Sequence, residues 1–255
     1  GSPLVVGVGQ DEHYVASDAG TLAGYTDRIV YLADHQIAVM CGSDLHVTHR
    51  NHGRVQPSIE SVDMPEQQQS TGGYDHYMLK EIYDQPATIQ AVLTIPRGEL
   101  AALAGMIHES RQSFLGGVGT TYYIASMGQY FFSQLAGCFL PAISTDEFPH
   151  LAQIGPEDSL IAISQSGETY DTLTAVRYAK KNGAKTGAVV NVMGSSLVRS
   201  VDVPILQGSG PEICVISTKA AMSQAAVLLL TAVELGQLRG FLGEDEVLRC
   251  REAVA

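Results

Sequence analysis

The chain has 255 residues, of which 45% are hydrophobic and 16% are charged, and this composition argues against a disordered protein. Its net charge of −12 argues against a nucleic-acid partner, because binding to nucleic acid normally requires a basic face. No apolar run reaches the roughly 18 residues of a membrane span, no secretory signal is visible, and the four cysteines lack CxxC spacing. We therefore expect a cytoplasmic protein with free thiols and no membrane partner.

Residues 1 to about 72 predict a β-rich region. Short apolar segments bounded by turn residues have the pattern of strands, at 4–8, 13–16, 28–32 and 36–40. Ser17-Asp18 can cap a short helix. Because no long helices separate these strands, we expect antiparallel pairing, as in the last strands of a larger sandwich.

His46, His49 and His52 have a spacing that invites a zinc interpretation. The surrounding segment alternates like a strand, which predicts His46 and His52 on one face and His49 on the other. No cysteine or carboxylate completes a tetrahedral set at a suitable spacing. We therefore expect a hairpin with solvated histidines, and no metal site or cofactor.

A linker and a short helix are predicted next. Residues 64–75 have the composition of a linker, and 76–87 predict an amphipathic helix that Pro86 ends. Tyr77, Leu79 and Ile82 belong to its apolar positions, and we assign its polar face no catalytic role.

From about residue 88 to residue 241, helix and strand patterns alternate. The expected strands are 113–117, 139–144, 160–164, 186–192 and 203–207, and the expected helices are 99–110, 120–136, 172–182 and 218–238. This order predicts an α/β fold, a doubly wound parallel sheet of about five strands with right-handed crossovers. Ligands of such sheets bind beyond the carboxyl ends of the strands, at the switch point.

The segment 160–172, LIAISQSGETYDT, combines a buried strand, a tight polar turn and a helix start. The first amides of a helix lack intrahelical partners and carry the positive end of the dipole, so a phosphate can bind there. Ser164, Ser166 and Thr169 can add hydroxyl donors without adding charge. The alternative is an ordinary capped loop, because Ser and Thr are favoured at such positions.

The string SQSGET at 164–169 resembles the phosphosugar-binding loop of sugar isomerase (SIS) domains. Further strings are similar to the family of glutamine–fructose-6-phosphate aminotransferases, which make glucosamine 6-phosphate. They are KEIY with the following QP at 80–86, GVGTT at 117–121, NVMGSS at 191–196 and EICVISTKA at 212–220. Val118 replaces a cysteine of the family turn CGTS, and Thr121 replaces its serine.

The resemblance implies a substrate site without a catalytic residue, metal or cofactor in this chain. The implied substrate-binding residues are Thr121, Ser164, Gln165, Ser166, Thr169, Val215 and Ser217, and the further candidates are Thr120, Gly167, Glu147 and Lys219. A lysine at a helix start is electrostatically unfavourable, because the positive end of the dipole lies there. For Lys219 we therefore expect either a bound anion nearby or a side chain that reaches into water. The alternative for Glu147 is an exposed turn carboxylate.

The resemblance also implies a domain order. Residues 1–72 are similar to the C-terminal part of a glutaminase domain, through GSPLV, ASD and VYL; 73–95 would be a linker, 96–241 the SIS domain, and 242–255 the start of a connection to a second SIS domain. The family glutaminase uses an N-terminal cysteine as its nucleophile. Because residue 1 is glycine and the first cysteine is Cys41, we expect no glutamine hydrolysis. The chain starts without methionine and stops within a helical pattern, so we expect a piece of a longer protein.

The expected function is to bind fructose 6-phosphate or glucosamine 6-phosphate without turnover, because the resemblance places the isomerising groups in the second SIS domain. SIS domains usually pair, so a homodimer is the expected assembly. One alternative is a non-catalytic phosphosugar-binding module. Another is a complete small isomerase, for which Glu147, Glu168 and His150 are the acid–base candidates.

Overall fold

The computed structural model describes residues 4–17, 19–22, 24–61, 71–214 and 216–254. The chain divides into two compact units, Gly1–Ser70 and Thr71–Ala255. Most of the predicted linker at 64–75 therefore lies outside the described residues.

The N-terminal unit contains two small antiparallel sheets. One has the strand order β2-β1-β3-β7 and the other has the order β4-β5-β6. The strands are β1 (Val5–Val8), β2 (His13–Ala16), β3 (Arg28–Tyr31), β4 (Gln36–Cys41), β5 (Asp44–His49), β6 (Gly53–Val55) and β7 (Glu60–Ser61). A 3-10 helix, η1 (Ala19–Leu22), follows β2. The four predicted strands and their antiparallel pairing are confirmed.

The predicted arrangement of the three histidines is wrong. The strand β5 ends at His49, and the chain turns before β6, so the alternation of faces does not extend to His52. The His49 and His52 rings stack at 4.5 Å, whereas His46 Nδ1 lies 2.8 Å from Nη2 of Arg54. Among the described residues, no group of three or more His, Cys, Asp or Glu side chains is arranged to hold a metal ion.

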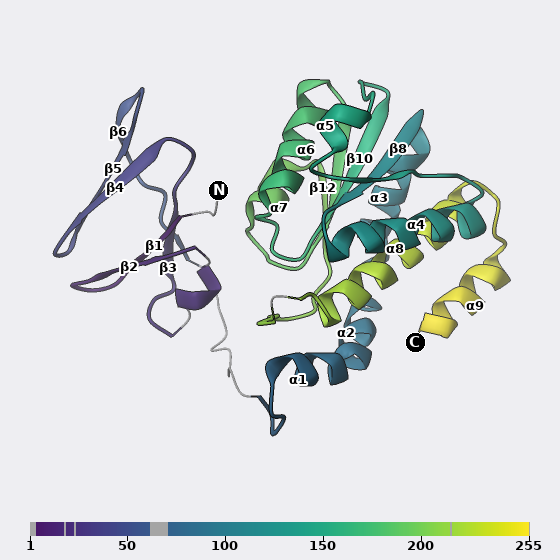
Figure 1. Ribbon diagram of the computed structural model, residues 1–255, viewed down its shortest axis with the longest axis horizontal. Coiled ribbons are helices and arrows are strands. Elements are labelled where there is room, and N and C mark those ends of the chain that lie inside the picture. The colour runs from purple at the N-terminus through teal and green to yellow at the C-terminus, as the bar shows by residue number, and fades with distance from the viewer. Residues whose placement is uncertain (1–3, 18, 23, 62–70, 215, 255) are drawn as a thin grey trace. The chain divides into compact units, whose positions relative to one another are not determined.

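A parallel sheet forms the centre of the second unit, as predicted (Figure 1). Its five strands have the order β12-β11-β10-β8-β9. Its strands are β8 (Gln112–Gly117), β9 (Ala142–Ser144), β10 (Asp158–Ser164), β11 (Lys185–Val190) and β12 (Val203–Leu206). All seven residues of β10 are buried, in agreement with the apolar run from Leu160 to Ile163 at its centre.

Helices cover both faces of this sheet (Figure 1). The helices in the described part of this unit are α1 (Tyr77–Tyr83), α2 (Gln85–Val92), α3 (Arg97–Glu109), α4 (Thr120–Ala136), α5 (Phe148–Leu151), α6 (Tyr170–Lys181), α7 (Ser196–Ser200), α8 (Lys219–Leu238) and α9 (Glu244–Val254). The core on one face joins α2, α3, α4 and α8 to the strands, and the core on the other face joins α5, α6 and α7. Successive strand residues alternate between these cores: Ile161 and Ile163 enter the first, and Leu160 and Ala162 enter the second.

The single helix predicted at 76–87 is two helices. α1 ends at Tyr83, and Pro86 lies in the first turn of α2 instead of ending a helix. Proline is tolerated in a first turn because its missing N–H would have no intrahelical acceptor there. The amphipathic pattern is also reversed, since Leu79 and Ile82 are 41% and 40% exposed, whereas Glu81 is 2% exposed.

Within the described residues, α8 is the one helix that is long and apolar enough to cross a membrane. It packs against α2, α3 and α4, and 78% of its most apolar stretch is buried inside the protein. Its apolar character therefore accompanies a position in the core.

Candidate phosphosugar site

The loops that carry the sequence motifs meet at one edge of the sheet, because parallel strands place their carboxyl ends together. β9 lies on one side of β8, whereas β10, β11 and β12 lie on its other side. The direction of winding therefore changes between β8 and β10, which is where open α/β sheets bind ligands. The loops 117–121 and 164–169 follow these two strands.

The loop 164–169 gathers hydroxyl groups around the start of α6. Ser164 Oγ accepts a hydrogen bond from the Gly167 amide at 3.0 Å and lies 3.3 Å from Thr169 Oγ1. Ser166 Oγ accepts one from the Glu168 amide at 3.1 Å. Thr169 is the N-cap residue of α6 and makes no capping hydrogen bond with its side chain. The dipole of α6 thus points at a turn lined by hydroxyls, which is the arrangement of an anion site.

Gly167 is required by the packing of this loop. Its φ is +68°, a conformation that glycine adopts without strain. A Cβ at this position would lie 2.2 Å from Ser195 Oγ and 2.9 Å from Cγ2 of Val190. The close approach lets the Leu197 amide donate to the Gly167 carbonyl at 3.0 Å.

The loop 191–196 is joined to the loop 164–169 by hydrogen bonds from its backbone amides. The Asn191 amide donates to the Gln165 carbonyl at 3.2 Å, and the Ser196 amide donates to Glu168 Oε1 at 2.7 Å. The side chain of Glu168 therefore organises the start of α7, which leaves it poorly placed as the acid or base of an isomerase. The other acid–base candidates, Glu147 and His150, are exposed at the two ends of the short helix α5.

The Thr121 hydroxyl is committed to its own loop. Its Oγ1 accepts from the Val118 amide and donates to the Val118 carbonyl, both at 2.9 Å, and the side chain is buried. Gly117 allows this turn, because a Cβ there would lie 2.5 Å from the Thr121 carbonyl. The neighbouring Thr120, at the start of α4, is only half-buried. In this loop, Thr121 shapes the turn and Thr120 has the less enclosed hydroxyl.

The loop 212–220 is closed by its own carboxylate. Glu212 Oε1 accepts from the Thr218 and Ala220 amides at 2.8 and 3.1 Å, and Oε2 accepts from Ser217 Oγ at 2.9 Å. The negative charge of Glu212 therefore caps the start of α8. Val215, a predicted sugar contact, lies outside the described residues.

Lys219 is buried, and its ammonium is directed at a carboxylate of the chain. Its side chain is 7% exposed, and its Nζ lies 3.5 Å from Oδ2 of Asp84, between α1 and α2. The same oxygen is 2.7 Å from the Lys80 ammonium. Burial raises the pKa of Asp84, but the hydrogen bond and charge of Lys80, and then the charge of Lys219, outweigh burial and lower that pKa. The alternative of a lysine that reaches into water is thus wrong.

Sequence reasoning missed Glu81, which enters the same region from α1. Its Oε1 accepts from the Ile213 amide at 2.6 Å, and both of its oxygens lie 3.3 Å from the Cys214 amide. The KEIY string at 80–83 could have indicated a specific role for Glu81, because helical packing alone does not require a carboxylate at that position. The hydroxyls of Thr145 and Thr172, which the sequence also did not predict to meet, are buried and lie 3.3 Å apart.

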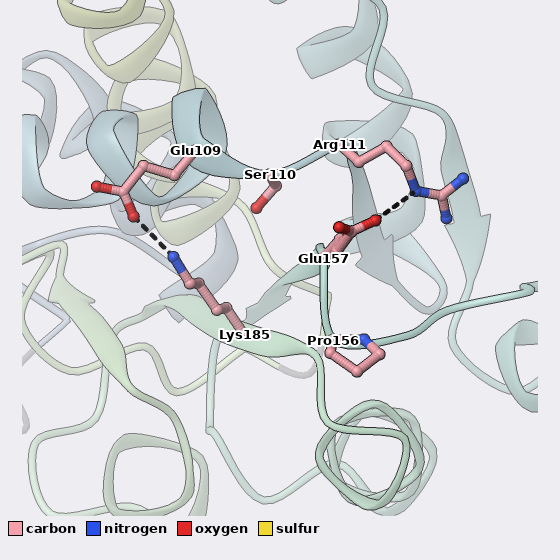
Figure 2. A pocket seen from close by; sticks show the side chains of 6 residues that line it. All are labelled: Glu109, Ser110, Arg111, Pro156, Glu157 and Lys185. Carbon is pink, nitrogen blue, oxygen red and sulfur yellow. Dashed lines mark hydrogen bonds and ion pairs between the residues drawn. The ribbon is translucent and has the colours of Figure 1, made fainter.

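An open hollow of about 520 Å³ lies at the opposite edge of the sheet, where β8, β10 and β11 begin (Figure 2). Its lining residues are Glu109, Ser110, Arg111, Pro156, Glu157 and Lys185. Lys185 pairs with Glu109 at 2.7 Å, and Arg111 pairs with the buried Asp158 at 2.9 Å and approaches Glu157 at 4.0 Å. The cations of this hollow already have carboxylate partners, and the hollow is separate from the loops at the carboxyl edge.

Comparison with curated proteins finds aminotransferases along almost the whole chain. Glutamine–fructose-6-phosphate aminotransferase [isomerizing] of Fusobacterium nucleatum is 35% identical over 253 residues, which cover 96% of this chain and 42% of the relative. The protein of the same name from Methanothermobacter thermautotrophicus is 38% identical over 236 residues, which cover 92% of this chain and 40% of the relative. The chain thus spans about two fifths of the length of these relatives.

Solved structures share the fold of the second unit. The C-terminal domain of glucosamine-fructose-6-phosphate aminotransferase from Francisella tularensis has a TM-score of 0.67 and 29% identity, over 72% of this chain and 54% of that chain. Glucosamine-6-phosphate deaminase from Thermotoga maritima has the same fold, with a TM-score of 0.52 and 20% identity, over 70% of this chain and 52% of that chain. The resemblance predicted from the sequence motifs is confirmed by these relatives. The family model of the SIS domain matches residues 106–234, about half of the chain, and the chain therefore belongs to the SIS domain family.

Proposed function

We propose that this chain is the phosphosugar-binding part of a glutamine–fructose-6-phosphate aminotransferase, with fructose 6-phosphate or glucosamine 6-phosphate as its ligand. One observation carries the proposal. The hydroxyls of Ser164, Ser166 and Thr169 surround the start of α6, and the side chain of the N-cap residue Thr169 does not cap this helix. A dianionic phosphate supplies the acceptors that such a turn lacks.

The phosphate and the sugar would occupy different parts of the site. The turn 164–169 would hold the phosphate, and Gln165 would contact the ligand from the same loop. Thr120, Val215 and Ser217 would meet the sugar from the neighbouring loops. Thr121 contributes by shaping its loop, since its hydroxyl bonds to Val118. In this proposal Gly167 permits the close backbone approach.

Turnover would require groups outside these residues. The family resemblance places the isomerising acid–base groups in a second SIS domain, and within the described residues the exposed Glu147 and His150 and the engaged Glu168 form no catalytic pair. We therefore expect these 255 residues to bind the phosphosugar without converting it.

The domain order follows from the same proposal. Residues 1–72 would correspond to the C-terminal part of a glutaminase domain, 73–95 to a linker, 96–241 to the SIS domain, and 242–255 to the start of a further connection. The antiparallel sheets of the first unit are compatible with the first assignment. Two chains would pair through their SIS domains, and the protein would act in amino-sugar synthesis in the cytoplasm.

Calorimetric titration of the purified chain tests the proposal. Fructose 6-phosphate and glucosamine 6-phosphate should bind, and free fructose should bind at least about tenfold more weakly, because a charge-assisted hydrogen bond contributes about 1.5–3 kcal/mol. Equal affinity for fructose and fructose 6-phosphate, or no binding of either phosphosugar, would contradict the proposal.

A further inference from the structure

The helix α1 is tied to the loop 212–220 although the two segments are more than 120 residues apart in the sequence. The carboxylate of Glu81 is 2% exposed, and it accepts hydrogen bonds from the backbone amides of Ile213 and Cys214. The shorter of these bonds is 2.6 Å. The backbone that leads into residues 217–220 is therefore held by a side chain from a helix outside the sheet.

A second tie from the same helix reaches the other end of that loop. Asp84, which follows α1, lies 3.5 Å from the buried ammonium of Lys219 at the start of α8. The two ties lie on either side of Ser217, whose hydroxyl donates to Glu212. The position of Ser217 therefore depends on contacts before and after it in the chain.

Burying the Glu81 carboxylate is costly, because a charged group loses its hydration and recovers it only in part from the two amides. The neighbouring Leu79 and Ile82 are substantially exposed, so the orientation of α1 is not explained by burial of its apolar residues. What the orientation does achieve is to present two carboxylates to a single loop at the carboxyl edge of the sheet.

We infer that Glu81 is a positioning residue of the phosphosugar site, which holds the backbone of Ile213 and Cys214 so that Ser217 can meet the sugar. This inference rests on the proposed function, in which the phosphate binds the turn 164–169 and Ser217 meets the sugar. Glu81 touches neither part of the ligand. Its removal should therefore weaken recognition of the sugar while leaving recognition of the phosphate unchanged.

The test compares two ligands on the full chain. Titration calorimetry gives the affinity for fructose 6-phosphate, and competition by inorganic phosphate gives the affinity for the anion alone. We expect Glu81→Ala to weaken fructose 6-phosphate binding about tenfold and to change phosphate binding less than about twofold. Glu81→Gln keeps one oxygen acceptor for the amides, so it should recover most of the sugar affinity.

The matched control is Glu99→Ala, which removes a carboxylate from an exposed position in the first turn of α3. It should change neither affinity. A parallel loss of both affinities in Glu81→Gln would show a general structural role and overturn the inference. Unchanged fructose 6-phosphate binding in Glu81→Ala would also overturn it. If the wild-type chain binds phosphate but not fructose 6-phosphate, the proposed function fails first, and the positioning role falls with it.

Discussion

Two helices begin at the same edge of the parallel sheet, and their first turns differ in what satisfies them. The start of α8 holds a carboxylate of the chain itself, because Glu212 accepts from two amides and from Ser217. The start of α6 instead has hydroxyls at Ser164 and Thr169 and no side-chain cap from its N-cap residue. Both helices present the positive end of their dipole at this edge, so the side chains decide which turn can receive an external anion.

The largest effect is expected from a substitution that adds a side-chain atom to the turn before α6. Gly167→Ala places a Cβ 2.2 Å from Ser195 Oγ at a residue with φ of +68°. We expect phosphosugar binding to fall by more than about a hundredfold, and the free energy of unfolding to fall by about 1–3 kcal/mol from backbone strain. Calorimetry and urea denaturation measure the two effects.

Gly105→Ala is the control for this substitution. Gly105 lies inside α3, and a Cβ there meets no atom within 4 Å. Alanine should stabilise that helix by roughly 0.5–1 kcal/mol and leave binding unchanged. Tight phosphosugar binding by Gly167→Ala would contradict the assignment of the anion to this turn.

The capped turn gives the next largest effect, on stability rather than on phosphate binding. Glu212→Ala removes the acceptor of the Thr218 and Ala220 amides, so we expect unfolding free energy to fall by about 1–2 kcal/mol. The affinity for inorganic phosphate should not fall, because the anion binds at α6. If the anion bound the start of α8 instead, the Glu212 carboxylate would compete with it for the same amides. A tenfold gain of phosphate affinity in this variant would therefore contradict the assignment to α6.

A single hydroxyl tests the open turn more gently. Thr169→Val removes the donor beside Ser164 while keeping the shape of the side chain, and phosphosugar affinity should fall about fivefold to tenfold. Thr174→Val makes the same change in α6, at a buried hydroxyl that has no hydrogen-bond partner among the described residues. Its affinity should equal that of the wild type, so similar losses in both variants would contradict a specific role for Thr169.

The smallest expected effect concerns the ion pair between Asp84 and Lys219 at the start of α8. Because the pKa of Asp84 is lowered from 3.8, its ionised form contributes stability that is complete above pH 3.8 and is lost as the pH falls through the lowered value. Asp84→Asn should lower the unfolding free energy at pH 7 by less than about 1 kcal/mol, since the Asp84 side chain is 31% exposed. Denaturant titrations should show that the difference in unfolding free energy between the wild type and this variant decreases below pH 3.8. If the difference is the same at every pH, the negative charge of Asp84 is not its cause.

Local patterns predicted the sheet and the open turn well. The helix expected at 120–136 has those bounds in the structure, because its apolar spacing and the following Gly137 are both local signals. The turn at 164–169 could also be predicted, since a strand, a small-residue turn and a helix start follow one another in the chain.

Contacts between distant segments could not be predicted in this way. Periodicity identified Leu79 and Ile82 as the buried side of α1, but the structure buries Glu81, whose partners are amides near residue 213. Lys219 is buried for a similar reason, because its carboxylate partner Asp84 comes from another helix. The prediction that His52 shares a face with His46 was wrong because the strand β5 ends at His49, before His52.

A crystal structure of the chain grown with fructose 6-phosphate would show whether an external anion binds the start of α6 and not the start of α8. We expect phosphate oxygens within hydrogen-bond distance of the hydroxyls of Ser164, Ser166 and Thr169 and of the first amides of α6, with Glu212 still capping α8. A phosphate at the start of α8 in place of the Glu212 carboxylate, or in the hollow beside Lys185, would contradict this expectation.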